Sequence, residues 1–224
     1  MGGTFRGRRI AGLYFSGIEL RDLLVAWLAL GVAFTFFFVG GLDGGGLDRL
    51  LAAGVVLPFA VSLATAGLGF LLHEVAHKVV AIRYDQVAEF RANNRMLGLA
   101  VLISLTGFIF AAPGAVHHRG RLTAREHGHI AVAGPVVNLL LTAAFVPVLV
   151  AGVAMGSGTL ALVGERGIAI NILLAAFNLI PYGPLDGNTV MGWHKGVWVT
   201  LFVPSAALTV LLVFLLGFGF GGPF

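Results

Sequence analysis

The stretch GFLLHEVAHKVV, residues 69–80, places two histidines and a glutamate in a run that is otherwise lipid-soluble. An uncharged run of 22 residues, 51–72, leads directly into the first of them, His73. The next arginine, Arg83, follows ten residues after His73, or roughly 15 Å further along a helix. Ionisable groups at such depth in a membrane are costly and usually functional. The stretch therefore predicts a membrane helix that carries a functional site.

The composition excludes a soluble globular protein. Of the 224 residues, 58% are hydrophobic and 11% charged, and the mean hydropathy is +0.96, which predicts an integral membrane protein in contact with the lipid bilayer. The net charge of +4 is small, and in a membrane protein basic residues report orientation, so we expect no nucleic-acid partner. Cysteine is absent, so a metal site would need histidine and carboxylate ligands.

Four apolar runs are long enough to cross a bilayer as helices: 23–39, 51–72, 130–154 and 197–220. A fifth, 167–182, is shorter and carries Asn171 and Asn178, which lie seven residues apart and so share one helix face. Amides within a membrane helix are expected to face protein rather than lipid. These runs predict an all-α polytopic membrane protein with about five transmembrane helices.

A sixth apolar run, 96–116, is ambiguous because Gly107, Pro113 and Gly114 interrupt its second half. If it crossed the membrane, the arginines on its two flanks would lie on opposite sides. If it dips in and returns, every lysine and arginine except Arg49 and Arg166 lies on one side. The positive-inside rule favours the second arrangement. We therefore predict a re-entrant hairpin, a cytoplasmic N-terminus and an external C-terminus.

His73, Glu74 and His77 form the pattern H-E-x-x-H. On a helix, histidines at i and i+4 lie about one turn apart on one face, so both imidazoles can reach one Zn²⁺. Glu74, one step round the helix, can reach a water on that metal without displacing a ligand. A chance match at a solvated helix end is the alternative, but the depth of the motif argues against it. We predict a single zinc ion per chain.

A catalytic zinc site needs a third protein ligand. Apart from Glu74, only one acidic residue adjoins the core of an apolar span, namely Asp186 in NLIPYGPLDGN, 178–188. Pro181 and Pro184 are expected to end the preceding helix and leave an unwound segment. The same residues also suit an ordinary turn at the membrane edge. In the re-entrant topology, however, this segment and the His73 helix end on the same side of the membrane.

Three motifs in order, HEVAH (73–77), AGPVVN (133–138) and NLIPYGPLDG (178–187), resemble the site-2 protease family of intramembrane zinc metalloproteases. The resemblance extends from about residue 67 to residue 188. It implies that the zinc ligands are His73, His77 and Asp186 and that Glu74 is the general base and acid. It also implies that Asn178 holds the substrate backbone or polarises the scissile carbonyl.

The resemblance implies close helix packing along the AGPVVN segment, whose small residues permit it. The sequence departs from the family where a proline and a second glycine are common, because it has Gly183 and Asn188 there. We expect one domain, 1–224, with a catalytic core of about 51–190 and flanking transmembrane helices 23–39 and 197–220. The hairpin either packs as plain structure or presents a strand edge near Ile103 and Leu105 to the substrate.

The expected function is zinc-dependent hydrolysis of peptide bonds within or near transmembrane segments of membrane-tethered proteins, at a site near the cytoplasmic face. The alternatives are a catalytically silent relative that binds membrane helices and a metal-handling membrane protein. Retention of Glu74 argues against the first, since binding alone needs no base. A transporter would carry intramembrane ligands on several helices. The sequence does not predict the oligomeric state or the substrate's identity.

Overall fold

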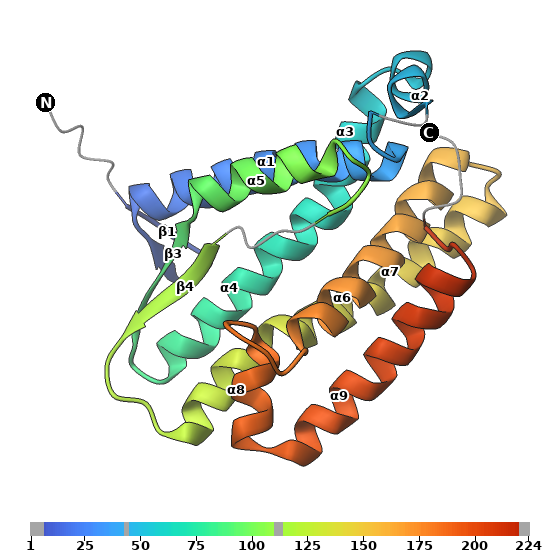
Figure 1. The fold of residues 1–224 in the computed structure, drawn as a ribbon. Coiled ribbons are helices and arrows are strands. Elements are labelled where there is room, and N and C mark those ends of the chain that lie inside the picture. The colour runs from blue at the N-terminus through green and yellow to red at the C-terminus, as the bar shows by residue number, and fades with distance from the viewer. Residues whose placement is uncertain (1–6, 43–44, 110–113, 220–224) are drawn as a thin grey trace, which may run out of the picture.

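The computed structural model describes residues 7–42, 45–109 and 114–219. The elements follow in the order β1 (Arg8–Ile10), β2 (Leu13–Phe15), α1 (Gly17–Val39), α2 (Gly46–Ala53), α3 (Val56–Ser62), η2 (Leu63–Gly67), α4 (Leu68–Arg83), β3 (Val87–Ala92), α5 (Asn94–Ser104), β4 (Gly114–Arg119), α6 (Ala124–Ala154), α7 (Gly158–Asn178), α8 (Asp186–Trp193), α9 (Lys195–Leu208) and η3 (Thr209–Leu215). Helices dominate, as Figure 1 shows.

Five helical segments are long and apolar enough to cross a membrane, and they confirm the predicted polytopic all-α fold. They are Gly17–Val39, Val56–Arg83, Ala124–Ala154, Gly158–Asn178 and Lys195–Leu215. The second joins α3, the π-helix η2 and α4 into one continuous helix that carries the H-E-x-x-H motif. The predicted boundaries differ from the observed ones, most of all for two spans. Gly54, at a φ of 74°, separates α2 from this helix, and α7 begins nine residues earlier than predicted.

Local capping explains where two of these spans begin. The Ser16 side chain accepts a hydrogen bond from the backbone N–H of Glu19 and so caps α1. At the start of α6, Thr123 and Glu126 form a reciprocal capping box. Gly40 ends α1 in the left-handed region at a φ of 84°, a conformation that favours glycine. Both α1 and α6 therefore begin at a local capping signal.

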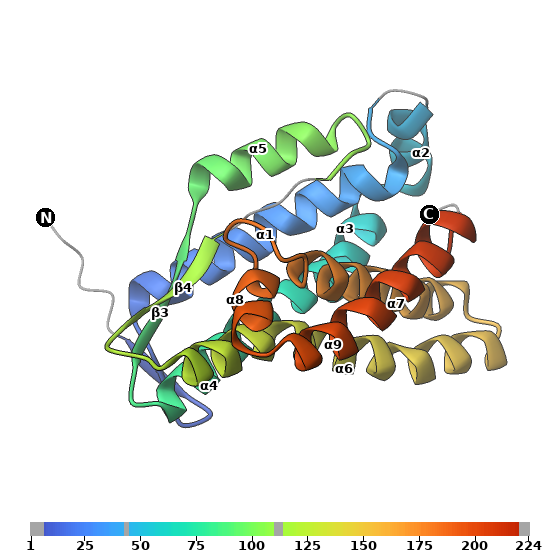
Figure 2. The same ribbon diagram turned by 60° about the horizontal axis from the view of Figure 1, so that its bottom comes forward.

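The segment between α4 and α6 dips alongside α1 and returns. The strands β3 and β4 pair antiparallel from Val87 opposite Arg119 to Ala92 opposite Gly114, so the chain leaves and re-enters at the same level. Between them, α5 runs along α1 (Figures 1 and 2), and the Leu42 N–H donates to the Leu105 carbonyl near the far end of α1. The predicted re-entrant hairpin is confirmed.

The predicted strand edge near Ile103 and Leu105 is wrong. Ile103 lies inside α5 and Leu105 caps it, because Asn93 accepts a hydrogen bond from the Met96 N–H and starts a helix there. The strand on the returning arm is β4, of which only the first three residues fall within the predicted hairpin, 96–116. Residues 110–113 lie outside the part that the structure describes.

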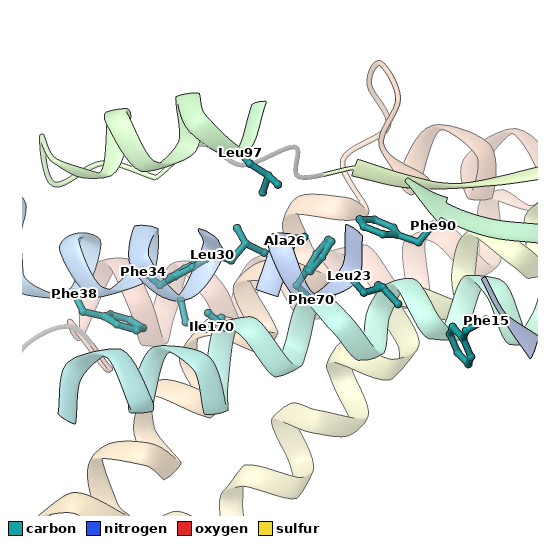
Figure 3. Close-up of a cluster of buried hydrophobic side chains, with 11 residues drawn as sticks. Phe15, Leu23, Ala26, Leu30, Phe34, Phe38, Phe70, Phe90, Leu97 and Ile170 are labelled. Atoms are coloured by element: carbon teal, nitrogen blue, oxygen red, sulfur yellow. The ribbon is translucent and has the colours of Figure 1, made fainter. Parts of the chain in front are cut away.

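An apolar cluster holds the hairpin, α1 and the long α3–α4 helix together (Figure 3). Leu30 and Phe34 from α1 meet Phe70 from α4, Phe90 from β3 and Leu97 from α5, all buried. The rings of Phe70 and Phe90 pack edge to face, with centroids 5.7 Å apart. The cluster therefore fixes β3 against the helix that carries the motif.

The two arginines that the charge count leaves on the other side do lie together at the far end of the bundle. Arg166 of α7 stacks over the Phe38 ring, 4.2 Å from its centroid, near the C-terminal end of α1. The guanidinium of Arg49 lies near Gly40 at the same end. The strands β3 and β4 lie at the opposite end of α1, where Glu19 contacts Phe90.

Candidate metal centre

Three ligand atoms from two distant elements converge. The Nε2 atoms of His73 and His77 lie 3.0 Å apart, and Asp186 Oδ2 lies 3.2 Å from the first and 3.3 Å from the second. Both imidazoles are buried, and the carboxylate is largely so. Within the described ranges, this is the one group of three or more such side chains whose ligand atoms lie close enough together to hold one ion.

The outer nitrogens of both imidazoles are already committed. His73 Nδ1 lies 2.6 Å from Asn138 Oδ1, and His77 Nδ1 lies 2.7 Å from the Ile130 carbonyl oxygen. Both partners are acceptors, so each Nδ1 carries the proton and each Nε2 presents a lone pair. Two lone pairs and a carboxylate oxygen therefore face one another, and a cation between them would relieve the repulsion. Two nitrogens and one oxygen are also the ligands of a catalytic zinc site.

Asn138 is the functional residue whose role the sequence analysis missed. Its amide nitrogen donates to the Gly69 carbonyl at 3.2 Å and to Asn171 Oδ1 at 3.0 Å, which leaves its oxygen for His73. Asn171 in turn donates to the Gly167 carbonyl at 2.9 Å. The network joins α4, α6 and α7 and fixes the amide orientation. The AGPVVN motif contained this signal, but it was interpreted only as helix packing.

Because Gly134 has no side chain, there is space beside it for the candidate ligand atoms to meet. A Cβ atom at this position would lie 2.5 Å from His73 Nε2 and 2.6 Å from His77 Nε2, well inside contact distance. Helix α6 therefore approaches α4 closely at this point, as the predicted small-residue packing requires. The same glycine keeps the ligand atoms accessible to an ion.

Glu74 is buried beside the candidate metal ligands, on the position after His73 in α4. Within the described part of the chain, its Oε2 atom has no hydrogen-bond partner. The carboxyl group also interacts with the backbone of Val116 in β4. An unsatisfied buried carboxylate oxygen is expensive, and its position next to the ligand group suits a proton acceptor for a reacting water.

Asp186 reaches the histidines because α7 ends early. The helix stops at Asn178, before Pro181, and α8 begins with Asp186 itself, so this residue opens a short helix rather than lying in a loop. Gly183 adopts a φ of 59°, which proline cannot adopt, and the Asn188 side chain donates to its carbonyl at 3.2 Å. Gly183 and Asn188, the two residues that depart from the family pattern, are thus joined by a hydrogen bond.

Burial raises the pKa of the Asp186 carboxyl, but when the two imidazoles are protonated, as in the metal-free site, their charge and hydrogen bonds lower it more, so it lies below its ordinary value. The group is therefore ionised at neutral pH. The neighbouring Gly187 packs against the end of α7, where a Cβ atom would lie 2.0 Å from the Leu179 carbonyl oxygen. This contact explains why the aspartate is followed by glycine.

Asn178 is the last residue of α7 and is partly buried. Its amide nitrogen donates to the Leu174 carbonyl of the same helix at 3.0 Å. The structure thus places it at the end of the helix that leads to Asp186, and its role toward a substrate stays a prediction.

Known proteins resemble this chain along most of its length. A protein of Methanocaldococcus jannaschii is 33% identical over 89% of this chain and 97% of its own. Relatives from Bacillus subtilis (YwhC) and Mycobacterium tuberculosis (Rip3) are each 30% identical, over 65% and 82% of this chain. This chain spans 73% of the first and 41% of the second. All three names begin "Putative zinc metalloprotease". No protein-family model and no solved structure matches.

Proposed function

Since the chain belongs to the site-2 protease family, we propose that it is a zinc-dependent endopeptidase that hydrolyses peptide bonds within or near transmembrane segments. The convergence of His73, His77 and Asp186 in a bundle of membrane-spanning helices carries this proposal. Zinc held by these three residues would supply a Lewis acid that activates water and polarises a carbonyl at neutral pH.

Glu74 is the proton carrier in this proposal. Its carboxylate takes a proton from the attacking water as the C–O bond forms, and it delivers that proton to the amine as the C–N bond breaks. The buried site excludes bulk water, which strengthens each electrostatic contact with the reacting groups. We assign Asn178 the supporting role of holding the substrate backbone or polarising the scissile carbonyl, as the family resemblance implies.

A substrate helix must unwind locally before its backbone can be attacked, and β4 offers a place for the extended segment. Among the described residues, β4 pairs with β3 alone, so no strand covers its other edge. Because Val116 of β4 interacts with the Glu74 carboxyl, that edge borders the proposed proton carrier. A substrate strand added to β4 would therefore lie next to the site.

We place the N-terminus and the site on the cytoplasmic side of the membrane. The supporting observation is the charge bias, since Lys78, Arg83 and Arg91 lie at the end of the bundle that holds the ligand group, whereas Arg49 and Arg166 lie at the other. The substrates that fit this site are membrane-tethered proteins, and the reaction class is regulated intramembrane proteolysis.

The test compares purified wild type with Glu74→Gln and His73→Ala for zinc content and for cleavage of a transmembrane test substrate. We expect Glu74→Gln to keep one zinc per chain but to lose cleavage by a factor of about 10²–10⁴, because only the proton carrier is removed. We expect His73→Ala to lose both. Full cleavage by Glu74→Gln would refute the assigned role, and a zinc-loaded wild type without cleavage would favour a silent relative.

A further inference from the structure

A buried carboxylate of α1 joins the motif helix to the hairpin. Glu19 Oε2 pairs with Lys78 Nζ at 2.5 Å, and Glu19 Oε1 accepts a hydrogen bond from the backbone N–H of Phe90 in β3 at 3.1 Å. Glu19 is 0% exposed and Lys78 is 2% exposed. Lys78 also lies over the Phe15 ring, 4.2 Å from its centroid, and follows the ligand His77 directly in α4.

Stability alone is a poor explanation for this ion pair. Taking two charges out of water is expensive, and apolar residues of similar volume often replace a buried pair without loss of stability. The feature that an apolar pair would not reproduce is the acceptor that Glu19 presents to the strand. The contact with Phe90 is therefore the property that needs an explanation.

Asp22, one turn further along α1, makes the same kind of contact. Its Oδ2 atom accepts from the backbone N–H of Ala92 at 3.3 Å. Phe90 and Ala92 are two positions apart in β3, so both N–H groups point to the same edge of the strand. In an antiparallel pair, the groups that face outward alternate with those that bond to the partner strand. The edge of β3 away from β4 is thus covered by two carboxylates of α1.

The outward edge of β4 lies on the opposite side of this two-stranded sheet. Phe90 and Val116 lie opposite each other in the register. Two opposite residues of an antiparallel pair point their N–H groups either both toward each other or both away, so the Val116 N–H also points away from the partner strand. The Val116 backbone interacts with the Glu74 carboxyl, so the outward edge of β4 borders the site. With the β3 edge covered, an extended segment can join the sheet only at β4.

We propose that Glu19 and Asp22 are positioning residues. They hold the outer edge of β3 and thereby set where the outer edge of β4 lies relative to α4. Lys78 fixes the same carboxylate to the helix that carries the ligands, so strand and ligand helix share one anchor. This inference rests on the proposed protease function, since it concerns how a substrate strand is presented to the site.

The test is a matched pair of double variants. In E19Q/K78M, the glutamine oxygen still accepts from Phe90 while the ion pair is gone. In E19L/K78M, both are gone and the buried volume is similar. For E19L/K78M we expect a KM for a transmembrane test substrate about tenfold above wild type, the scale of one hydrogen bond to a charged group. For E19Q/K78M we expect a KM close to wild type and, in both variants, an unchanged kcat per zinc-loaded enzyme.

A purely structural role gives a different result. It lowers the fraction of folded, zinc-loaded protein and so the apparent kcat, and it leaves KM unchanged. Asp22→Leu and Asp22→Asn form a second matched pair, whose leucine variant is expected to raise KM while the asparagine variant restores it. This pair decides the question if the buried double variants do not fold.

Amide hydrogen exchange supplies a readout that does not depend on activity. We expect the Phe90 backbone amide to exchange faster in E19L/K78M than in E19Q/K78M. We expect the Ala92 backbone amide to exchange faster in Asp22→Leu than in Asp22→Asn. Equal KM values within both matched pairs, with equal exchange at these amides, would overturn the inference. If the zinc-loaded wild type cleaves nothing, the protease function fails instead, and the exchange experiment still tests whether the two carboxylates hold the strand.

Discussion

At the scale of single residues, Asn138 determines which nitrogen of His73 faces the metal centre. Its oxygen accepts from His73 Nδ1, and its nitrogen is held by Gly69 and Asn171, so the amide cannot turn over without losing two hydrogen bonds. A partner of this kind orients the imidazole and raises its basicity as a ligand.

Replacing Asn138 with leucine keeps the volume but removes the acceptor. We expect the zinc dissociation constant to rise about 10- to 100-fold, because the imidazole loses its fixed tautomer. Competition with a zinc chelator measures this. Thr142→Val, one turn along α6, removes only a bond to the helix's own Asn138 carbonyl and is the control. Equal zinc affinity in Asn138→Leu and wild type would show that Asn138 does not support zinc binding through His73.

Gly134→Ala tests the space between the ligands. The added methyl group would press on both Nε2 atoms, so we expect zinc binding to weaken by about 1–3 kcal/mol. Gly192→Ala in α8 is the matched control, since a Cβ atom there meets nothing within 4 Å. Zinc titration of the two variants gives the comparison. If Gly134→Ala binds zinc as tightly as Gly192→Ala, the close approach of α6 does not matter to the site.

The sequence predicts a residue of this site most reliably when the position of its side chain depends only on neighbouring residues in the chain. His73 and His77 follow from helix periodicity alone, because a spacing of four residues stacks them on any helix. Asp186 needed the topology as well, since it lies 109 positions after His77. The contact between Asn138 and His73 depends on the close packing of α6 on α4, which the small residues of AGPVVN predict, and on which side chains then meet, which the motif alone does not specify.

At the scale of elements, the two-stranded sheet of β3 and β4 is the part that the sequence predicted least well. The strand β4 contains His117 and begins at Gly114, directly after Pro113, a composition typical of a loop. Its pairing with β3 joins residues that α5 separates, so no local periodicity reports it. One of the two interpretations of the hairpin placed a strand edge near Ile103 and Leu105 instead, where α5 forms and ends.

Val116→Pro tests the role of the β4 edge. Proline removes the N–H that points away from β3, and a strand edge tolerates that change. We expect cleavage to fall at least about tenfold while zinc content stays at one per chain, because the N–H that contacts the Glu74 carboxyl at this edge is lost. Val116→Ala removes the same side chain but keeps the N–H, and should cleave nearly normally. Similar activity in the two variants would argue against a role for this N–H at the site.

At the scale of the whole molecule, the structure agrees with the sequence on the number of spans and on the hairpin. Both follow from hydropathy and the charge bias, which are sums over many residues and tolerate errors at single boundaries. The packing of α1 was less accessible. The sequence treats 23–39 as a flanking helix, yet Glu19 and Asp22, just before that run, contact β3.

Orientation in the membrane can be tested directly because the chain has no cysteine. Val87 of β3 and Met155 between α6 and α7 are 69% and 74% exposed and lie at opposite ends of the bundle. With single cysteines at these positions, a membrane-impermeant thiol reagent added to intact cells should label Met155→Cys and spare Val87→Cys. Lysed cells, in which both should react, are the control. The reverse pattern in intact cells would place the site on the external side.

We expect His73, His77 and Asp186 to hold one zinc ion together. Zinc X-ray absorption of the purified protein, side by side with Asp186→Asn, tests this most directly. The expected result is one zinc per chain with two imidazole nitrogens at about 2.0–2.1 Å and oxygen ligands at about 2.0–2.2 Å, and a clear loss of bound zinc in Asp186→Asn. A full zinc equivalent with an unchanged spectrum in Asp186→Asn would contradict it.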